Sequence, residues 1–258
     1  MTDTSANGFR THVPTIVVFL AVGFAWEAAV DLFAIPKYLL PAPSAVLADI
    51  ISSYPTLAEN LWATMEAAFL GLIVGTSIAL SLAILFLSSR ILERALFPWA
   101  IILQTVPVLA IAPLLTIWLG FGIAPKIAVA GIITIFPVLV NTARGLKVAN
   151  TQILEMMSIV GATPWQVFRE VRIFSALPFL FAGLRIGCGS AVIGAIVAEF
   201  TGANKGIGTV IVAAGYRQDA TMLFAAIFCS CAATLALFYV VVGIERACLF
   251  WPDARPER

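Results

Sequence analysis

The sequence predicts an all-α integral membrane protein with about six transmembrane helices. Of its 258 residues, 61% are hydrophobic and only 11% are charged, and the mean hydropathy is +1.03. Soluble domains average about 45–50% apolar and about 25% charged residues. A chain of this size cannot bury so many apolar side chains in one water-soluble core, because small globular proteins keep too much surface. The apolar runs are also too long and too uniform for the strands of a membrane barrel.

Six runs reach the roughly 20 mostly apolar residues that a helix needs to cross a bilayer. They are residues 13–35, 61–88, 95–119, 124–143, 177–200 and 222–249. No small-residue cleavage site closes the first run early, so we interpret it as a retained helix rather than a signal peptide. The whole chain, residues 1–258, is interpreted as a single transmembrane domain.

Prolines and glycines add detail to these spans. Pro107 and Pro113 fall in the third span and Pro137 in the fourth, and proline in a membrane helix is tolerated where neighbours or a cavity satisfy the freed backbone groups. We therefore expect both spans to lie in the protein interior. Two G-x-x-x-G patterns, at 71–75 and 183–187, predict close helix contacts, with chance occurrence as the alternative. Before the second span, Ser44 is the expected N-cap of a short amphipathic helix.

Lysine and arginine residues in the short loops predict the orientation. With six spans both chain ends share a side, and that side carries ten cationic residues: Arg10, Arg90, Arg94, Arg144, Lys147, Arg169, Arg172, Arg246, Arg255 and Arg258. The opposite side carries four: Lys37, Lys126, Lys205 and Arg217. Because cytoplasmic loops are enriched in Lys and Arg, we expect both termini and the loop at about 144–176 in the cytoplasm.

Motifs of enzyme chemistry are missing from the sequence. The segment GANKGIG, residues 202–208, lacks the Lys-Ser/Thr pair of a phosphate-binding loop and is interpreted as a turn. His12 is the only histidine, and no cysteine shows metal-ligand spacing, so no metal site is expected. The net charge of +1 gives no reason to expect a nucleic-acid partner. We conclude that this chain alone is not an enzyme.

The cytoplasmic stretch EMMSIVGATPWQVFREVRIFSALP, residues 155–178, differs from its apolar surroundings. Residues 155–160 are expected to be helical, Gly161 to break the helix, Thr163 to cap a second helix and Pro164 to occupy its first position. The second helix is amphipathic, with Trp165 and Phe168 at helical spacing. Such a helix is suited to a groove on a partner protein. The alternative is an interfacial helix that lies on lipid headgroups.

This stretch also resembles the EAA loop in permease subunits of bacterial ABC importers. Glu155 and Gly161 keep the spacing of that loop, while Met156 and Met157 replace two alanines and Phe174 stands where many relatives carry a proline. Further segments are similar to the nitrate, sulfonate and taurine group of these permeases, so that the resemblance covers nearly the whole chain. They are LLPAPSAVL, PVLAIAPLLTIWLGFGIAPKI, FPVLVNTARGL and GLRIGCGSAVIGAIVAEFTGANKGIG.

The resemblance implies a type I ABC importer permease in the bacterial inner membrane. It would form the translocation path for a small organic or oxyanion solute, and its partners would be cytoplasmic ATP-binding subunits, an extracytoplasmic solute-binding protein, a second permease copy in a homodimer, and the lipid bilayer. This chain would hold no cofactor, because ATP and Mg would be bound by the ATPase partner. The residues that couple to the ATPase would be Glu155, Gly161, Ala162, Thr163, Pro164, Trp165 and Phe168.

Polar residues inside the predicted spans are candidates for lining the translocation path, because polar groups are expensive in lipid. The set is Gln104, Thr105, Asn141, Arg185 and Glu199. For the first three the alternative is hydrogen bonding between helices. For Arg185 and Glu199 the alternative is structural ion pairing.

Two other functions are alternatives to the importer subunit. A self-sufficient secondary transporter or channel is expected to show inverted repeats or buried carboxylates near the membrane midplane, and neither is convincing in this sequence. A membrane enzyme or assembly factor is disfavoured because the chain lacks an acid/base or metal constellation.

Overall fold

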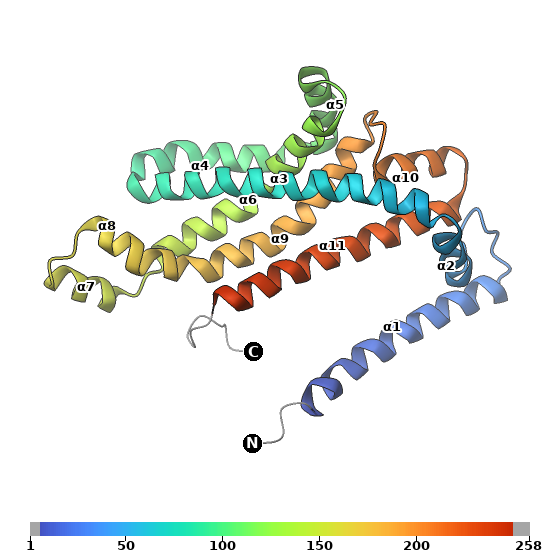
Figure 1. Ribbon diagram of the computed structural model, residues 1–258, viewed down its shortest axis with the longest axis horizontal. Helices are drawn as coiled ribbons and strands as arrows, with labels where there is room; N and C mark the ends of the chain where they lie inside the picture. The colour runs from blue at the N-terminus through green and yellow to red at the C-terminus, as the bar shows by residue number, and fades with distance from the viewer. Residues whose placement is uncertain (1–5, 250–258) are drawn as a thin grey trace. The chain divides into compact units, whose positions relative to one another are not determined.

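All regular secondary structure in the described part of the chain is helical, and turns and short loops join the helices. The computed structural model describes residues 6–249, with side chains from Pro14 onward except that of Ile16. The all-α prediction is confirmed, and Figure 1 shows the helices. They are α1 (Ala6–Leu32), α2 (Pro43–Ser52), α3 (Tyr54–Ser88), α4 (Arg90–Thr105), α5 (Val108–Leu119), α6 (Ile123–Lys147), α7 (Thr151–Ile159), α8 (Pro164–Val167), the π-helical turn η1 (Phe168–Arg172), α9 (Ile173–Glu199), α10 (Ile207–Tyr216) and α11 (Ala220–Cys248).

Helices that are long and apolar enough to cross a membrane coincide with the predicted spans. Among the described residues these are α3, α6, the continuous segment Pro164–Glu199 and α11, with α4 and α5 forming a fifth span if they are counted together. The first predicted span, residues 13–35, coincides largely with α1, whose first side chains lie outside the described ones. Three of the ten arginine and lysine residues that predict the cytoplasmic side also have side chains outside the described ones: Arg10, Arg255 and Arg258.

The third predicted span, residues 95–119, is a broken helix. α4 and α5 are bent by 98° at the break formed by Val106 and Pro107. Val106 has an extended backbone, with φ −68° and ψ 128°, because the ring of a following proline disfavours the helical conformation. The prediction that this span lies in the interior is wrong for the single chain, since α4 and α5 bury only three residues between them.

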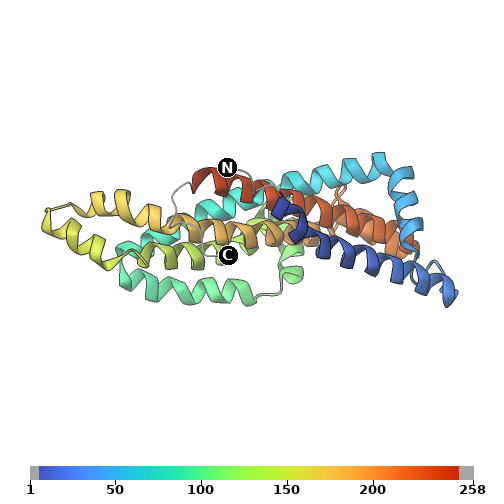
Figure 2. The ribbon, with the colours of Figure 1, turned by 90° about the horizontal axis from the view of Figure 1, so that it is seen from below.

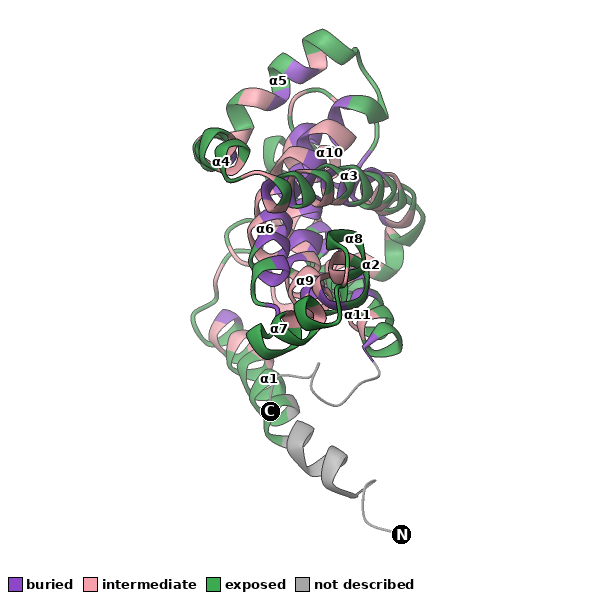
Figure 3. Cartoon of the chain, turned by 90° about the vertical axis from the view of Figure 1, so that its left-hand side faces the viewer, coloured by how far each residue is buried: buried purple, intermediate pink, exposed green. Residues whose placement is uncertain are grey.

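The larger of two compact units contains the main core. It is made of two stretches, Glu59–Thr209 and Ser230–Arg258. Its helices α6 and α9 lie side by side in Figures 1 and 2, and the buried residues of Figure 3 gather along them. Leu72 of α3 packs against α9 in one apolar cluster, and Phe86 of α3 packs with Leu139 of α6 in another. The predicted interior position of α6 is therefore confirmed.

Glycines allow α3, α6 and α9 to approach closely. A Cβ atom at Gly75 would lie 2.5 Å from the carbonyl oxygen of Gly131, and one at Gly183 would lie 3.0 Å from Cα of Val138. Gly71 faces the Cβ atom of Ala130 at an even closer approach. Small residues at helix crossings let backbones pack tightly in membranes, where the hydrophobic effect does not drive helix association. The predicted contacts at the two G-x-x-x-G patterns are confirmed.

The smaller unit comprises Met1–Ala58 and Val210–Cys229. In it, Trp26 of α1 contacts two aromatic rings of α11, those of Phe224 and Phe228, at centroid distances of 5.6 and 6.0 Å. Such ring pairs contribute packing energy beyond the area that they bury. They tie α1 to the first half of α11 within this unit.

The start of α2 differs from the sequence prediction. Ser44 is not the N-cap, because α2 begins one residue earlier at Pro43, whose fixed φ suits the first turn of a helix. The backbone N–H groups at the start of a helix need hydrogen-bond acceptors, and here a carboxylate of α1 accepts from one of them. The backbone N–H and the hydroxyl group of Ser44 donate to the two carboxylate oxygens of Glu27 at 3.0 and 2.5 Å.

Candidate functional site

The segment between α6 and α9 starts with a capped helix and a sharp break. The side chain of Asn150 accepts a hydrogen bond from the backbone N–H of Gln152 at 2.9 Å and caps α7. After α7 ends, the N–H of Gly161 donates to the carbonyl oxygen of Ser158 at 3.1 Å. Gly161 has φ +72°, a left-handed conformation that closes helices and that glycine adopts without a steric penalty. The predicted break at Gly161 is confirmed.

A capping box fixes the other side of this turn. The Thr163 hydroxyl oxygen accepts from the N–H of Gln166 at 3.3 Å, and the Gln166 side chain accepts from the N–H of Thr163 at 2.7 Å. Pro164 occupies the first position of α8. Each partner therefore satisfies a backbone donor that a helix start leaves open. The predicted N-cap at Thr163 and the predicted first helical position of Pro164 are confirmed, and the turn is held at both ends.

Beyond α8 the chain passes through the π-helical turn η1 before α9. The rings of Trp165 and Phe168 are stacked, with centroids 5.6 Å apart. Nη1 of Arg172 donates to the carbonyl oxygen of Leu146 at 2.8 Å, in the last turn of α6. Sequence periodicity did not reveal η1 or this bond, because both depend on how α6 and α9 pack. The bond ties the segment directly to the end of α6.

Apolar side chains are exposed on both sides of the turn. The exposed fractions are 85% for Ile159, 70% for Val160 and 66% for Trp165. In Figures 1 and 2, α7 and α8 project past the ends of α3 and α4. Exposed large apolar side chains on a projecting segment are typical of a surface that binds another protein.

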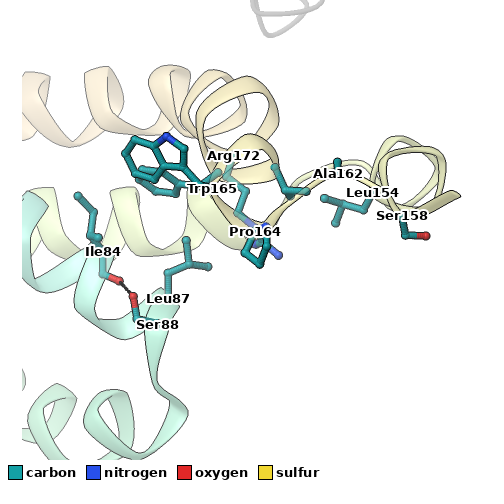
Figure 4. A pocket seen from close by; sticks show the side chains of 11 residues that line it. Ile84, Leu87, Ser88, Leu154, Ser158, Ala162, Pro164, Trp165 and Arg172 are labelled. Atoms are coloured by element: carbon teal, nitrogen blue, oxygen red, sulfur yellow. Dashed lines mark hydrogen bonds between the residues drawn. The ribbon is translucent and has the colours of Figure 1, made fainter. Parts of the chain in front are cut away.

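The seven predicted coupling residues lie in this one projecting segment. A hollow of about 540 Å³ separates it from the end of α3, as Figure 4 shows. Four of the seven line the hollow: Ala162, Pro164, Trp165 and Phe168. Gly161 and Thr163 form the turn itself, and Glu155 is exposed on α7.

A buried ion pair joins the start of α6 to the end of α9, at the helix ends far from the projecting segment. Nζ of Lys126, in the first turn of α6, is 3.1 Å from Oε1 of Glu199, the last residue of α9, and their side chains are 7% and 0% exposed. The Thr64 hydroxyl of α3 donates to the same carboxylate at 2.8 Å, and the N–H of Gly208 donates to Oε2 at 2.8 Å. Lys126 also donates to the carbonyl oxygen of Lys205. Such extra hydrogen bonds are what make a buried ion pair tolerable.

The glycine-rich segment of residues 202–208 surrounds this carboxylate. Gly206 has φ +138°, and a Cβ atom there would overlap the carboxylate of Glu199. The N–H of Ile207 donates to the Thr64 hydroxyl oxygen at 2.8 Å. The prediction of a turn rather than a phosphate loop is confirmed. The alternative of structural ion pairing holds for Glu199, but Lys126 was not predicted as its partner. The available signal was a lysine and a glutamate at the outer ends of two predicted neighbouring spans.

A second ion pair lies between α9 and α11. Nη2 of Arg185 donates to Oε1 of Glu245 at 3.0 Å, with side-chain exposures of 34% and 14%. Nε of Arg185 is buried and has no hydrogen-bond partner among the described residues. Of the five residues predicted to line a path, Arg185 and Glu199 thus both have ionic partners.

The other three predicted path residues make local hydrogen bonds or are exposed. Nδ2 of Asn141 donates to the carbonyl oxygen of Pro137 at 2.7 Å, one turn earlier in α6. The Thr105 hydroxyl donates to the carbonyl oxygen of Ile102, and Gln104 is exposed on α4. These contacts neither assign nor remove a role in the path.

Comparisons with known sequences identify the family. Residues 67–247 match the family described as binding-protein-dependent transport system inner membrane component. The chain is 35% identical to the formylaminopyrimidine transport permease protein ThiX of Halalkalibacterium halodurans, over 95% of this chain and 98% of that protein. It is 34% identical to the riboflavin transport system permease protein RibX of Chloroflexus aurantiacus, over 93% and 89%. Identity to the putative aliphatic sulfonates transport permease protein SsuC of Bacillus subtilis is 28%, over 94% and 87%.

Solved structures show the same fold. An inward-facing structure of the MetNI methionine ABC transporter matches with a TM-score of 0.67 at 20% identity, covering 76% of this chain and 97% of that one. An amino acid ABC transporter matches with a TM-score of 0.59 at 17% identity, over 78% and 97%. The chain therefore belongs to the binding-protein-dependent transport system inner membrane components and is a permease subunit of an ATP-binding-cassette importer.

Proposed function

We propose that this permease imports a small organic solute across the bacterial inner membrane, with both termini in the cytoplasm, and that residues 155–168 dock on the ATP-binding subunit. The observation that carries the proposal is the projecting turn, held by Gly161 on one side and the Thr163 capping box on the other, with exposed apolar side chains beside it. The ATPase of such an importer is a separate subunit, in agreement with a sequence that has no phosphate loop.

The contacts of this segment suggest how force is transmitted. The capping box makes the turn stiff, and Arg172 joins the segment to Leu146 at the end of α6. α8, η1 and α9 form one continuous helical path. A displacement of the docked turn by the ATPase is therefore delivered to α6 and α9 together, the two most closely packed helices of the larger unit. Stiff elements of this kind carry coupling between distant sites.

The exposed, broken span α4–α5 supports assembly as a homodimer. Trp99, Ile117 and Trp118 are exposed by 65%, 77% and 68%. The break at Val106 and Pro107 interrupts the backbone hydrogen bonding of the helix. Irregular backbone at membrane depth is tolerated where protein or a water-filled cavity covers it. A second permease copy provides this cover, and a path between the two copies then receives solute from an extracytoplasmic binding protein.

The relatives favour a nitrogen heterocycle as the solute class. Identity reaches 35% and 34% to permeases named for formylaminopyrimidine and riboflavin, compared with 28% and 30% to two permeases named for aliphatic sulfonates. The cognate binding protein, purified with the complex, is expected to melt at a higher temperature with a pyrimidine or flavin ligand, since ligand binding stabilises the folded state. Stabilisation by sulfonates instead of heterocycles in the same thermal-shift panel will contradict this assignment.

Replacing Trp165 with aspartate is expected to weaken assembly with the ATP-binding subunit by at least about tenfold, because a buried aromatic anchor contributes about 2 kcal/mol or more to an interface. The measurement is co-purification of the ATPase with tagged permease, quantified by titration. The matched control is Tyr216→Asp, which places the same charge on an exposed aromatic position outside the coupling segment. Equal ATPase recovery with both variants will rule out docking through Trp165.

A further inference from the structure

Two adjoining hollows lie where α3 and α6 end and α4 begins. Neither is lined by the turn residues Gly161 and Thr163. One, of about 430 Å³, is lined by Phe86, Leu87, Arg90, Glu93, Lys147 and Arg172. The other, of about 400 Å³, is lined by Arg90, Glu93, Arg94, Phe97 and Pro98. They share Arg90 and Glu93, so they form one double hollow with an apolar side and a charged side. The rings of Phe86 and Phe97 contact each other at a centroid distance of 6.4 Å.

The charged side of the double hollow is strongly cationic. Four cations line it, Arg90, Arg94, Lys147 and Arg172, against the single carboxylate of Glu93. That carboxylate is taken by Lys147, with which it forms an ion pair. In the part of the chain that the structure describes, no carboxylate pairs with the three arginines. Their charges are therefore available to an anion.

The position along the helices indicates which anion. The apolar helices α3 and α6 end at Ser88 and Lys147, and α4 begins at Arg90. Residues at the ends of membrane-crossing helices lie at the level of the lipid headgroups. The hollow combines arginines without a carboxylate partner at that level with the half-buried apolar side chains of Leu87 and Phe97.

We propose that the double hollow binds the phosphodiester headgroup of an anionic phospholipid, with Arg90, Arg94 and Arg172 facing the phosphate. The acyl chains start along the half-buried side chains of Leu87 and Phe97, while Phe86 is buried behind them. Basic pockets between membrane helices on the cytoplasmic side are known to suit such headgroups. The ATP-binding subunit is the less suitable occupant, because the segment proposed to dock it, α7 and α8, projects past this level in Figures 1 and 2.

Removing the two arginines of α4 tests the site. In the purified importer complex, the double variant Arg90→Gln with Arg94→Gln is expected to weaken phosphatidylglycerol binding by about 30-fold, since each basic residue near an anionic lipid surface contributes about a factor of five. Binding is measured by native mass spectrometry with titrated phosphatidylglycerol, and phosphatidylcholine serves as the zwitterionic comparison. Arg90 and Arg94 are both exposed, and neither has an ion-pair partner among the described residues. The double variant is therefore expected to fold normally.

The matched control removes one charge in the last turn of α6 and one in the last turn of α11. Arg144→Gln with Arg246→Gln changes two exposed arginines that do not line the hollows, and it is expected to leave binding unchanged. Equal weakening by both double variants, or equal binding of phosphatidylcholine by the wild type, will overturn the site in favour of diffuse attraction. Displacement of the lipid by inorganic phosphate at equal concentration will overturn the lipid assignment in favour of a free anion. None of these outcomes depends on ATPase docking.

Discussion

Replacing Glu199 with alanine is expected to destabilise the larger unit by about 3–5 kcal/mol, the typical effect of removing one partner of a buried ion pair. The Lys126 ammonium then stays in a site where its side chain is 7% exposed, without its carboxylate. The N–H of Gly208 also loses its acceptor, and the Thr64 hydroxyl keeps only the carbonyl oxygen of Asn60. Because folded proteins are stable by only about 5–15 kcal/mol, this is a large fraction of the total. Thermal unfolding of the purified protein in detergent measures it.

A double variant separates charge from packing. Lys126→Met with Glu199→Leu removes both charges and keeps the volume, so it is expected to be much more stable than the single Glu199→Ala variant. Thr64→Val removes the hydroxyl that donates to the Glu199 carboxylate and accepts from the N–H of Ile207, so it is expected to lose about 1–3 kcal/mol. An unfolding temperature of the Glu199→Ala variant equal to that of the wild type will show that the carboxylate does not hold these segments together.

Replacing Gly161 with proline is expected to abolish stimulation of ATP hydrolysis by the solute-loaded binding protein. Proline fixes φ near −65°, whereas Gly161 has φ +72°, and proline also lacks the N–H that donates to Ser158. The turn must then take another path and move the exposed residues beside it away from the ATPase. The measurement is the ATPase rate of the reconstituted importer in liposomes, with and without loaded binding protein.

The control at the same position is Gly161→Asn. Asparagine tolerates the left-handed conformation better than other residues with a side chain, and a Cβ atom at Gly161 meets no other atom within 4 Å. This variant is therefore expected to keep most of the stimulation. Full stimulation with proline, at normal expression of the complex, will contradict the proposal that this turn couples the permease to the ATPase.

The turn formed by residues 161–163 was predictable because its causes are local. Gly161 ends a helix and Thr163 with Gln166 forms a capping box, and these interactions depend on residues three or fewer positions apart. The buried pair was not predictable in the same way. Lys126 and Glu199 are separated by 73 residues, and Lys126 has the position of an ordinary outer-loop charge in the sequence. Pairing required the crossing of α6 and α9, which periodicity alone does not give.

By itself, the sequence determined the class of protein, its apolar spans and the shape of the turn formed by residues 161–163. These follow from composition, run length and capping chemistry, which act within one helix or one turn. Only the tertiary structure decided the 98° break between α4 and α5, the acceptor that Glu27 provides at the start of α2, and the burial of Lys126 against Glu199. Each of these depends on which helix lies next to which, and in a membrane that choice rests on close packing and polar partners distant in the chain.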